Sequence, residues 1–170
     1  MSLALVASGQ EQTQINSPYV GTPYPVVDAM LRLAKVKKSD VVYDLGCGDG
    51  RILVEAAKTY GAHGVGVDIN PERIQEANEL ARREGVSQLL TFRVGDLYDV
   101  NLQGATLVTL YLLPDVNLKL RPKLQKQLRP GARIVSHSFD MGDWKPNKTE
   151  ATEGDKIFLW KIRGHFWHFG

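Results

Sequence analysis

The chain has 170 residues, of which 43% are hydrophobic and 24% charged, and 21 basic residues stand against 19 acidic ones. This is an ordinary globular composition with enough apolar residues for one sizeable core. A formal charge of +2 gives no strong signal for nucleic acid or an anionic membrane as the partner. One cysteine excludes an internal disulfide, and the four histidines lack the spacing of a structural zinc site.

We expect a flexible N-terminal segment over residues 1–17 and one domain over residues 18–170. Within the first segment, Leu3–Gln10 is apolar and rich in small residues, but it is too short to span a bilayer. It is either a frayed terminus on a cytoplasmic protein, which we prefer, or the remnant of the signal peptide of an exported one. The chain carries no candidate transmembrane span, and its oligomeric state is not indicated.

The first predicted elements are a helix and a strand. Thr22-Pro23 has the pattern of a helix cap followed by a first-turn proline, and apolar residues follow at helical spacing from Val27 to Ala34. The run Val41–Leu45 is β-rich and almost entirely apolar, which is typical of a strand covered on both faces.

Helices and strands then alternate. Helices are predicted over Ile52–Tyr60, after the cap pair Asn70-Pro71, and around Val116, Leu120, Leu124 and Leu128, where Pro122 predicts a kink or a late helix start. Strands are predicted over Gly64–Asp68, Leu89–Val94, Thr106–Leu110 and Ala132–His137. At the end of the chain, Lys156–Arg163 and His165–Phe169 predict two β segments joined by a turn at Gly164.

This order of elements predicts an α/β fold of the Rossmann-like kind. Right-handed crossovers give a mostly parallel twisted sheet with helices on both faces, here followed by a C-terminal antiparallel β-hairpin. Such sheets bind ligands beyond the carboxyl ends of their strands. The site is therefore expected in the loops after Asp44, Asp68, Asp96, Leu110 and His137.

A glycine-rich loop with acidic residues, Asp44-Leu45-Gly46-Cys47-Gly48-Asp49-Gly50, follows the first predicted strand. A nicotinamide or flavin dinucleotide would need glycine or alanine where Arg51 stands, and the aspartates would repel its pyrophosphate. A ligand with a sulfonium and an ammonium group is instead attracted by carboxylates. The loop therefore favours a cationic cofactor.

The order of these motifs resembles the signature of class I S-adenosylmethionine (SAM)-dependent methyltransferases. The signature is Asp-x-Gly-x-Gly-x-Gly after the first strand, an acidic residue, Asp68, ending the second, and Gly95-Asp96 after the third. The resemblance implies SAM as the cofactor and S-adenosylhomocysteine as the product. It also implies that Asp44, Gly46, Gly48 and Gly50 hold the methionine moiety.

The same resemblance implies the contacts of the rest of the cofactor. Asp68 would chelate the ribose hydroxyls, and Asp96 would accept from the adenine amino group. Leu97 and Ile69 would pack on the two faces of the adenine ring.

Three segments resemble, more narrowly, the bacterial relatives of the FAM173 and Dot1-like protein-lysine methyltransferases. They are Pro18–Pro23, the glycine loop with Arg51, and Ser136–Trp144. The resemblance implies that Tyr19, Thr22 and Pro23 fold over the methionine end of SAM. Gly21 stands where that family usually has proline, which loosens this segment.

The methyl acceptor implied by this resemblance is a protein lysine. A small molecule or RNA as acceptor stays open, as does a non-catalytic SAM-binding module. Methyl transfer is a direct displacement that depends on alignment, so no catalytic residue is assigned and no metal is expected. The loops Tyr111–Pro114 and Phe139–Trp144 are the expected walls of the acceptor channel, and Tyr111 is also a candidate cofactor contact.

Several residues allow both a structural and a functional interpretation. We interpret Cys47 as a buried filler rather than a nucleophile, whereas His137 is either substrate-facing or structural. We interpret a series of basic residues as a solvated helix face rather than an RNA-binding surface. The series is Lys119, Arg121, Lys123, Lys126 and Arg129. The tryptophans Trp144, Trp160 and Trp167 form either a substrate cage or, as we prefer, packing against the sheet.

Overall fold

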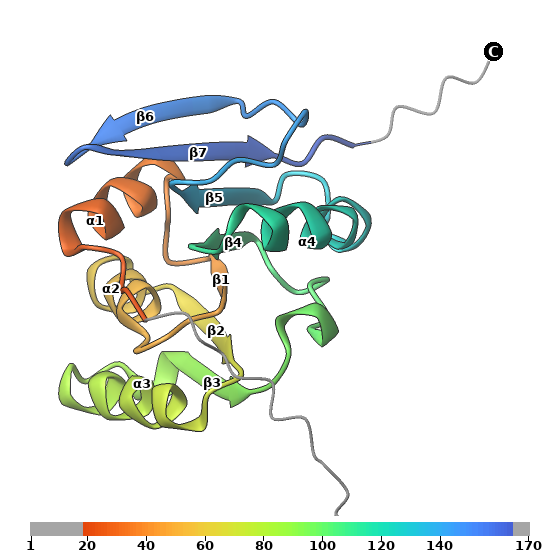
Figure 1. Ribbon diagram of the computed structural model, residues 1–170. Coiled ribbons are helices and arrows are strands. Elements are labelled where there is room, and N and C mark those ends of the chain that lie inside the picture. The colour runs from red at the N-terminus through yellow and green to blue at the C-terminus, as the bar shows by residue number, and fades with distance from the viewer. Residues whose placement is uncertain (1–18, 165–170) are drawn as a thin grey trace, which may run out of the picture.

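The computed structural model describes residues 19–164 (Figure 1). The expectations for Leu3–Gln10 and for His165–Phe169 therefore lie outside the described residues, as does Trp167. The elements are α1 (Tyr24–Leu33), β1 (Val41–Leu45), α2 (Arg51–Tyr60), β2 (His63–Asp68), α3 (Pro71–Arg83), η1 (Ser87–Leu89), β3 (Leu90–Val94), η2 (Leu97–Asp99), β4 (Leu107–Leu110), α4 (Pro114–Gln127), β5 (Arg133–His137), β6 (Lys148–Thr152) and β7 (Asp155–Lys161).

Seven strands form one sheet in the order β3-β2-β1-β4-β5-β7-β6. The first five strands pair in parallel, and β7 pairs antiparallel with both β5 and β6. The direction of winding reverses between β1 and β4, and the carboxyl ends of strands at such a point are where α/β sheets bind ligands. The predicted Rossmann-like fold class, with its C-terminal hairpin, is confirmed.

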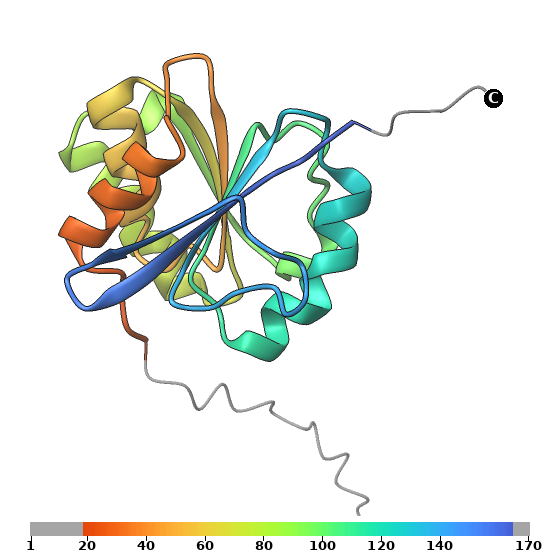
Figure 2. The same ribbon diagram turned by 90° about the horizontal axis from the view of Figure 1, so that it is seen from above.

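Helices cover both faces of the sheet, as predicted. Figure 2 shows α1, α2 and α3 on one face and α4 on the other. The first face has a core in which Met30 and Leu31 of α1 and Leu53 of α2 are fully buried. On the second face, Leu120 and Leu124 of α4 are fully buried in a separate cluster that also contains Trp160. Both faces of β1 and β4 are therefore covered, and the ends of these strands remain for ligand binding.

The residues predicted for the hairpin are partly wrong. The strand predicted over Lys156–Arg163 corresponds to β7, but its partner β6 precedes it in the chain instead of following it. The turn lies at Glu153-Gly154, with φ of 49° and 81°, whereas Gly164 lies beyond the strand. β6 escaped prediction because its sequence Lys-Thr-Glu-Ala-Thr lacks alternating apolar residues. As an edge strand it is exposed at four of its five positions.

Two predicted helix signals have other roles in the structure. The N-cap of α1 is Pro23, without a side-chain capping bond, and the Thr22 hydroxyl instead contacts His137. A late start of α4 at Pro122 is wrong, because the helix begins at Pro114 and continues through Pro122. Pro122 lies at an exposed position of this helix.

A buried ion pair ties the amino ends of the strands together. Two guanidinium nitrogens of Arg133 donate to the Asp40 carboxylate, both at 2.9 Å, and the Thr106 hydroxyl donates to it at 2.7 Å. Burial opposes ionisation of Asp40, but these hydrogen bonds outweigh it and lower its pKa to about 2. The Arg133 Nε also donates to the Ala34 carbonyl, so the pair connects α1, β1 and β5 at the edge opposite the glycine loop.

Candidate cofactor and methyl-transfer site

Asp44 is the most deeply buried acid at the carboxyl edge. It lies in β1, the middle one of the five parallel strands, is 2% exposed, and accepts a hydrogen bond of 2.9 Å from the Thr109 hydroxyl of β4. Burial raises the pKa of Asp44 to about 7, the hydrogen bond from Thr109 opposes this, and the nearby Asp68 and Asp49 add to it. A cation placed beside Asp44 would relieve this cost, because opposite charge favours the ionised carboxylate.

The glycine loop wraps around the end of β1 in a left-handed backbone conformation, with φ of 76° at Gly46 and 54° at Gly48. The amide of Gly48 donates to Asp68 Oδ2 at 2.9 Å, and the other Asp68 oxygen accepts from Asn70 at 2.9 Å. Each carboxylate oxygen keeps a lone pair for a hydroxyl donor. Asp68 is therefore fixed in place beside the loop and can still accept from a ligand.

Gly50 is required for a different reason. A Cβ at this position would lie 2.8 Å from the Cβ of Ala77 in α3 and 3.0 Å from the Phe92 ring in β3. The φ of Gly50 is 80°, which L side chains rarely adopt. This glycine thus lets the start of α2 pack against α3.

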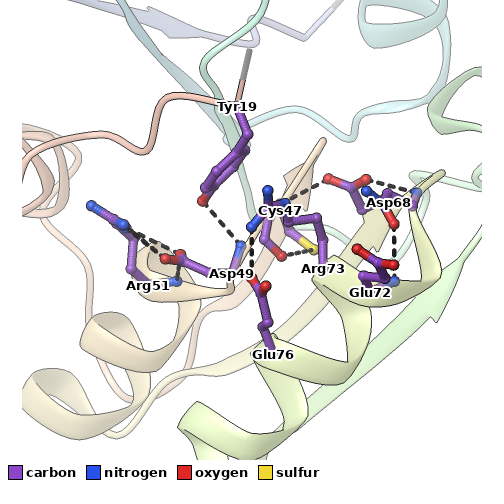
Figure 3. A network of polar contacts seen from close by, with 10 residues as sticks. Tyr19, Cys47, Asp49, Arg51, Asp68, Glu72, Arg73 and Glu76 are labelled. Carbon is purple, nitrogen blue, oxygen red and sulfur yellow. Dashed lines mark hydrogen bonds and ion pairs between the residues drawn. The ribbon is translucent and has the colours of Figure 1, made fainter. Parts of the chain in front are cut away.

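Tyr19 lies across the glycine loop (Figure 3). Its Oη accepts a hydrogen bond of 3.0 Å from the Asp49 amide, and a Cβ on Gly48 would come within 2.3 Å of its ring. The Arg73 guanidinium of α3 stacks on the Tyr19 ring, 4.1 Å from the ring centroid. Burial raises the pKa of Tyr19 to about 12, so the hydroxyl stays neutral at physiological pH.

Arg51 fastens the segment before α1 to this loop. Its Nη2 pairs with Asp49 at 2.7 Å, its Nη1 donates to the Thr22 carbonyl at 3.1 Å, and its guanidinium stacks on the Tyr24 ring at 5.3 Å. A Cβ on Gly21 would meet the Arg51 guanidinium at 2.4 Å. The guanidinium therefore occupies the space that the family's usual proline would need.

Thr22 and His137 meet at the carboxyl end of β5. The Thr22 Oγ1 lies 3.1 Å from His137 Nδ1, and the two residues are 4% and 1% exposed. The Tyr111 ring lies 4.0 Å from the imidazole, and Asp155 of β7 lies 3.3 Å from its Nε2. Burial lowers the pKa of His137, and Asp155 only partly opposes this, so the ring is neutral at physiological pH.

The residues predicted for the adenine end lie farther along the same edge. Asp96 is exposed and accepts from the Tyr98 amide at 2.9 Å, Leu97 is half-buried, and Ile69 is 57% exposed. Val94, at the end of β3, pairs with Asp68, so these residues lie close to the ribose-side acid. Pro23, which was predicted to cover the methionine end instead, is exposed at the start of α1.

The loop Tyr111–Pro114 contacts the glycine loop directly, since a Cβ on Gly46 would lie 2.9 Å from a methyl group of Leu112. Asn117 of α4 is fully buried and donates to the carbonyls of Phe139 and Asp140, both at 3.3 Å, so α4 holds the loop Phe139–Trp144. The two expected channel walls are thus anchored on the second face of the sheet.

The other ambiguous residues have mainly structural surroundings. Cys47 is 5% exposed, burial raises its pKa further above the usual range, and its sulfur fills the space beside Gly66. Trp160 is fully buried and donates to the Trp144 carbonyl at 2.8 Å, which excludes it from a surface cage.

The basic series, of which all but Arg129 lies on α4, is half-buried or exposed. Its member Arg121 pairs with Asp143, and Lys119 lies 4.3 Å from the Tyr98 ring centroid. Among residues 19–164, no group of three His, Cys, Asp or Glu side chains could hold a metal ion, and no helix is long and apolar enough to cross a membrane.

Sequence reasoning missed four contributors to the site. Thr109 was detectable, because it is a hydroxyl in an otherwise apolar strand. Arg51 was used against a dinucleotide and as part of a family motif, but its contact with the Thr22 carbonyl has no local signal in the sequence. Arg73 and Asp155 reach the site through contacts that only the folded chain creates.

Comparison with known proteins agrees with this geometry. A family model described as the ANTKMT methyltransferase domain matches residues 44–148. A protein-lysine N-methyltransferase of Saccharolobus islandicus is 44% identical over 87% of this chain and 95% of its own length. The adenine nucleotide translocase lysine N-methyltransferase of mouse is 32% identical over 89% of this chain and 66% of its own length.

Solved structures show the same fold with the cofactor product. A protein of Salinibacter ruber, described as an RNA methyltransferase in complex with S-adenosyl-L-homocysteine, is 52% identical and superposes with a TM-score of 0.85. The match covers 88% of this chain and 97% of that one. The ribosomal protein L11 methylase of Lactobacillus delbrueckii, 18% identical with a TM-score of 0.70, shares the fold. The chain belongs to the ANTKMT methyltransferase family and is a SAM-dependent methyltransferase.

Proposed function

We propose that the chain transfers a methyl group from SAM to the side-chain amine of a lysine in a protein. The observation that carries this is the 44% identity to a protein-lysine N-methyltransferase, which spans 95% of that relative. A match over nearly the whole length includes the loops that receive the acceptor as well as the cofactor cradle.

The residues at the carboxyl edge fit the cofactor. When bound, SAM supplies an electrophilic methyl group on a sulfonium. Asp44 balances the positive charge of the methionine moiety, and the left-handed glycine backbone at Gly46 and Gly48 allows its close approach. Asp68 accepts from the ribose hydroxyls with the lone pairs that its two backbone contacts leave free.

The remaining predicted contacts complete the proposed binding site. Tyr19, Thr22 and Pro23 close over the methionine end, where Arg51 and Asp49 already hold the segment on the glycine loop. The exposed Asp96 and Ile69 and the half-buried Leu97 receive the adenine, and Tyr111 lies between the cofactor and the acceptor.

A lysine acceptor must lose a proton before it can attack. From a reference pKa of about 10.4, deprotonation at pH 7 costs about 4.6 kcal/mol. A water-poor channel lowers this cost because burial disfavours the ammonium form. The loop Tyr111–Pro114 and the anchored loop Phe139–Trp144 are placed to form such a channel beside the glycine loop.

Methyl labelling tests the acceptor. The protein is incubated with SAM that carries a tritiated methyl group and with separate protein, peptide and RNA fractions. Labelled protein is then hydrolysed, and its amino acids are separated to find methylated lysine. We expect label in lysine, and the RNA fraction is included because the relative of Salinibacter ruber is described as an RNA methyltransferase.

The variant Asp68→Ala is the control for cofactor binding. It removes the acceptor of the Gly48 amide and of the ribose hydroxyls, so SAM binding measured by calorimetry and labelling should fall together. Label found only in RNA, or in no lysine of the protein and peptide fractions, would overturn the lysine assignment. Unchanged SAM binding by Asp68→Ala would overturn the role given to this carboxylate.

A further inference from the structure

Three segments far apart in the sequence meet at one buried imidazole. His137 ends β5, Thr22 precedes α1, and Asp155 begins β7. Thr22 Oγ1 lies 3.1 Å from His137 Nδ1, across 115 positions of the chain, and Asp155 Oδ2 lies 3.3 Å from His137 Nε2. The three side chains therefore form a row that runs from the half-exposed β7 into the methyl-transfer edge.

The carboxylate of Asp155 selects the tautomer of His137. An ionised carboxylate can only accept hydrogen bonds. An unprotonated Nε2 facing it would therefore place two lone pairs against each other. The contact lies outside the geometry of a good hydrogen bond, but no other polar atom of residues 19–164 partners Nε2, so Asp155 is the group that favours a proton on this nitrogen. With the proton on Nε2, Nδ1 is an acceptor, and the Thr22 hydroxyl donates its hydrogen to it.

This arrangement leaves the lone pairs of Thr22 Oγ1 as the only free hydrogen-bonding capacity of its hydroxyl. They can accept an N–H but cannot donate. An attacking amine is a donor whose own lone pair must point at the methyl group, so an acceptor that holds its N–H also sets the direction of attack.

We infer that Asp155 and His137 are positioning residues that set the Thr22 hydroxyl to accept an N–H of the methyl-receiving amine. The inference rests on the proposed function, because it requires an amine acceptor. Thr22 belongs to the segment proposed to cover the methionine end of the cofactor, and His137 contacts Tyr111 of the expected channel wall at 4.0 Å. Both neighbours thus place the hydroxyl near the point where methyl and amine meet.

The backbone next to His137 supports a role beyond filling space. Ser138 has a φ of 68°, a left-handed conformation that costs free energy for a residue with a Cβ. Its amide donates to the Lys156 carbonyl at 2.8 Å, and its hydroxyl lies 3.4 Å from Asp155 Oδ1. The strained residue thereby links the strand that carries His137 to the carboxylate that orients it, and strain of this kind is often retained at functional sites.

The groups that face the imidazole also define its pH response. They are Asp155 from β7, Tyr111 from the connection after β4, and Thr22 from the segment before α1. Protonation of His137 would make Nδ1 a donor to Thr22 Oγ1 and release the hydroxyl hydrogen, so that the hydroxyl would no longer be restricted to accepting an N–H. Since burial lowers the pKa of His137, this change is confined to acidic pH.

The first test reads the tautomer without any acceptor. Nitrogen-15 NMR of the imidazole in the wild-type protein at pH 7.5 should show the proton on Nε2. The variant Asp155→Asn should show a mixture or a switch of the tautomers, because the neutral amide no longer favours one of them. A proton on Nδ1 in the wild type would overturn the inference whatever the acceptor proves to be.

The second test separates the hydroxyl from the packing at position 22. Thr22→Val keeps the shape and removes the hydroxyl, Thr22→Ser keeps the hydroxyl, and Thr149→Val makes the same change at an exposed site in β6. The assay uses saturating SAM and the lysine substrate that the labelling experiment identifies. We expect Thr22→Val to lose about 10- to 100-fold in kcat, because misplacement of the attacking group has effects of that order. Thr22→Ser should recover most of the rate that Thr22→Val loses, and Thr149→Val should stay within about threefold of wild type.

Asp155→Asn completes the design. It should lower kcat a few-fold with little change in the KM for SAM, and it should move the acidic limb of the kcat–pH profile, which a merely structural role would not do. If wild type labels lysine and Thr22→Val is equally fast, the inference fails and the proposed function stands. If wild type labels no lysine, both fail.

Discussion

Replacing Asp44 by asparagine should make the cofactor-free protein more stable and abolish its response to SAM. Asparagine keeps the shape of the side chain and an oxygen that can accept from the Thr109 hydroxyl, now at 2.9 Å from Asp44. It removes a carboxylate that the fold holds in an unfavourable place, since burial raises its pKa to about 7. The substitution therefore relieves a cost that the folded chain bears only in its ionised form.

The magnitude follows from proton linkage. The pKa of Asp44 rises from 3.8 to about 7, which is about three pKa units. At pH 8 this lowers the free energy of unfolding of the wild type by about 4 kcal/mol. The folded state binds the proton more tightly than the unfolded state, so the stability of the wild type falls as pH rises from about 4 to about 7 and stays low above that. The gain in the free energy of unfolding of Asp44→Asn over the wild type should accordingly be large at pH 8 and smaller by about 3 kcal/mol at pH 5.

Thermal unfolding measures this directly. Even half of the calculated gain, about 2 kcal/mol, would raise the Tm by about 4–8 °C for a chain of this size. With SAM at 100 times its Kd the wild type should gain about 2.7 kcal/mol, whereas Asp44→Asn should gain nothing measurable. Asp28→Asn, at an exposed position in α1, is the matched control and should leave the Tm unchanged with or without SAM.

Two results would refute the reasoning. One is an Asp44→Asn protein that is less stable than wild type at pH 8 without SAM, because the carboxylate would then stabilise the fold. The other is a stability difference that is equal at pH 5 and pH 8, because the effect would then have no connection with the charge of Asp44.

Three further outcomes are expected. Asp40→Ala leaves Arg133 buried without its partner and should cost about 3–5 kcal/mol in urea unfolding at pH 7. In the wild type the stability from this pair is present above about pH 4 and is lost as pH falls toward 2, because the pKa of Asp40 is lowered to about 2. Gly48→Ala puts a Cβ within 2.3 Å of the Tyr19 ring at a φ of 54°, so SAM binding by calorimetry should weaken at least about tenfold and the protein should lose about 1–2 kcal/mol. Cys47→Ala should keep kcat within about threefold, because burial raises the thiol pKa and no thiolate is available; a loss of a hundredfold would restore the nucleophile hypothesis.

The elements that local sequence determines were predictable. β1 and the glycine loop were predicted correctly because an apolar run, an acid and closely spaced glycines all lie within ten residues. The acids at successive strand ends were also informative, since a parallel sheet brings such positions to one edge. Asp44 and Asp68 do lie there, near enough that the charge of Asp68 raises the pKa of Asp44.

Contacts between distant segments were not predictable from one sequence. Thr22 looked like a helix cap, yet its hydroxyl faces His137, which lies 115 positions away. Arg51 carried no sign that it would hold the Thr22 carbonyl. β6 lacked an apolar face because an edge strand need not bury one, so the rule that finds strands by alternation had nothing to detect.

The polar and charged composition of β6 also protects the edge of the sheet against aggregation. An edge strand offers unpaired backbone groups to any other extended chain, and a long apolar edge promotes aggregation. Here Lys148 and Glu150 are exposed along a strand of only five residues. A strand from another molecule that extended the sheet past β6 would have to bring its side chains against these charges, so this boundary of the fold resists further growth.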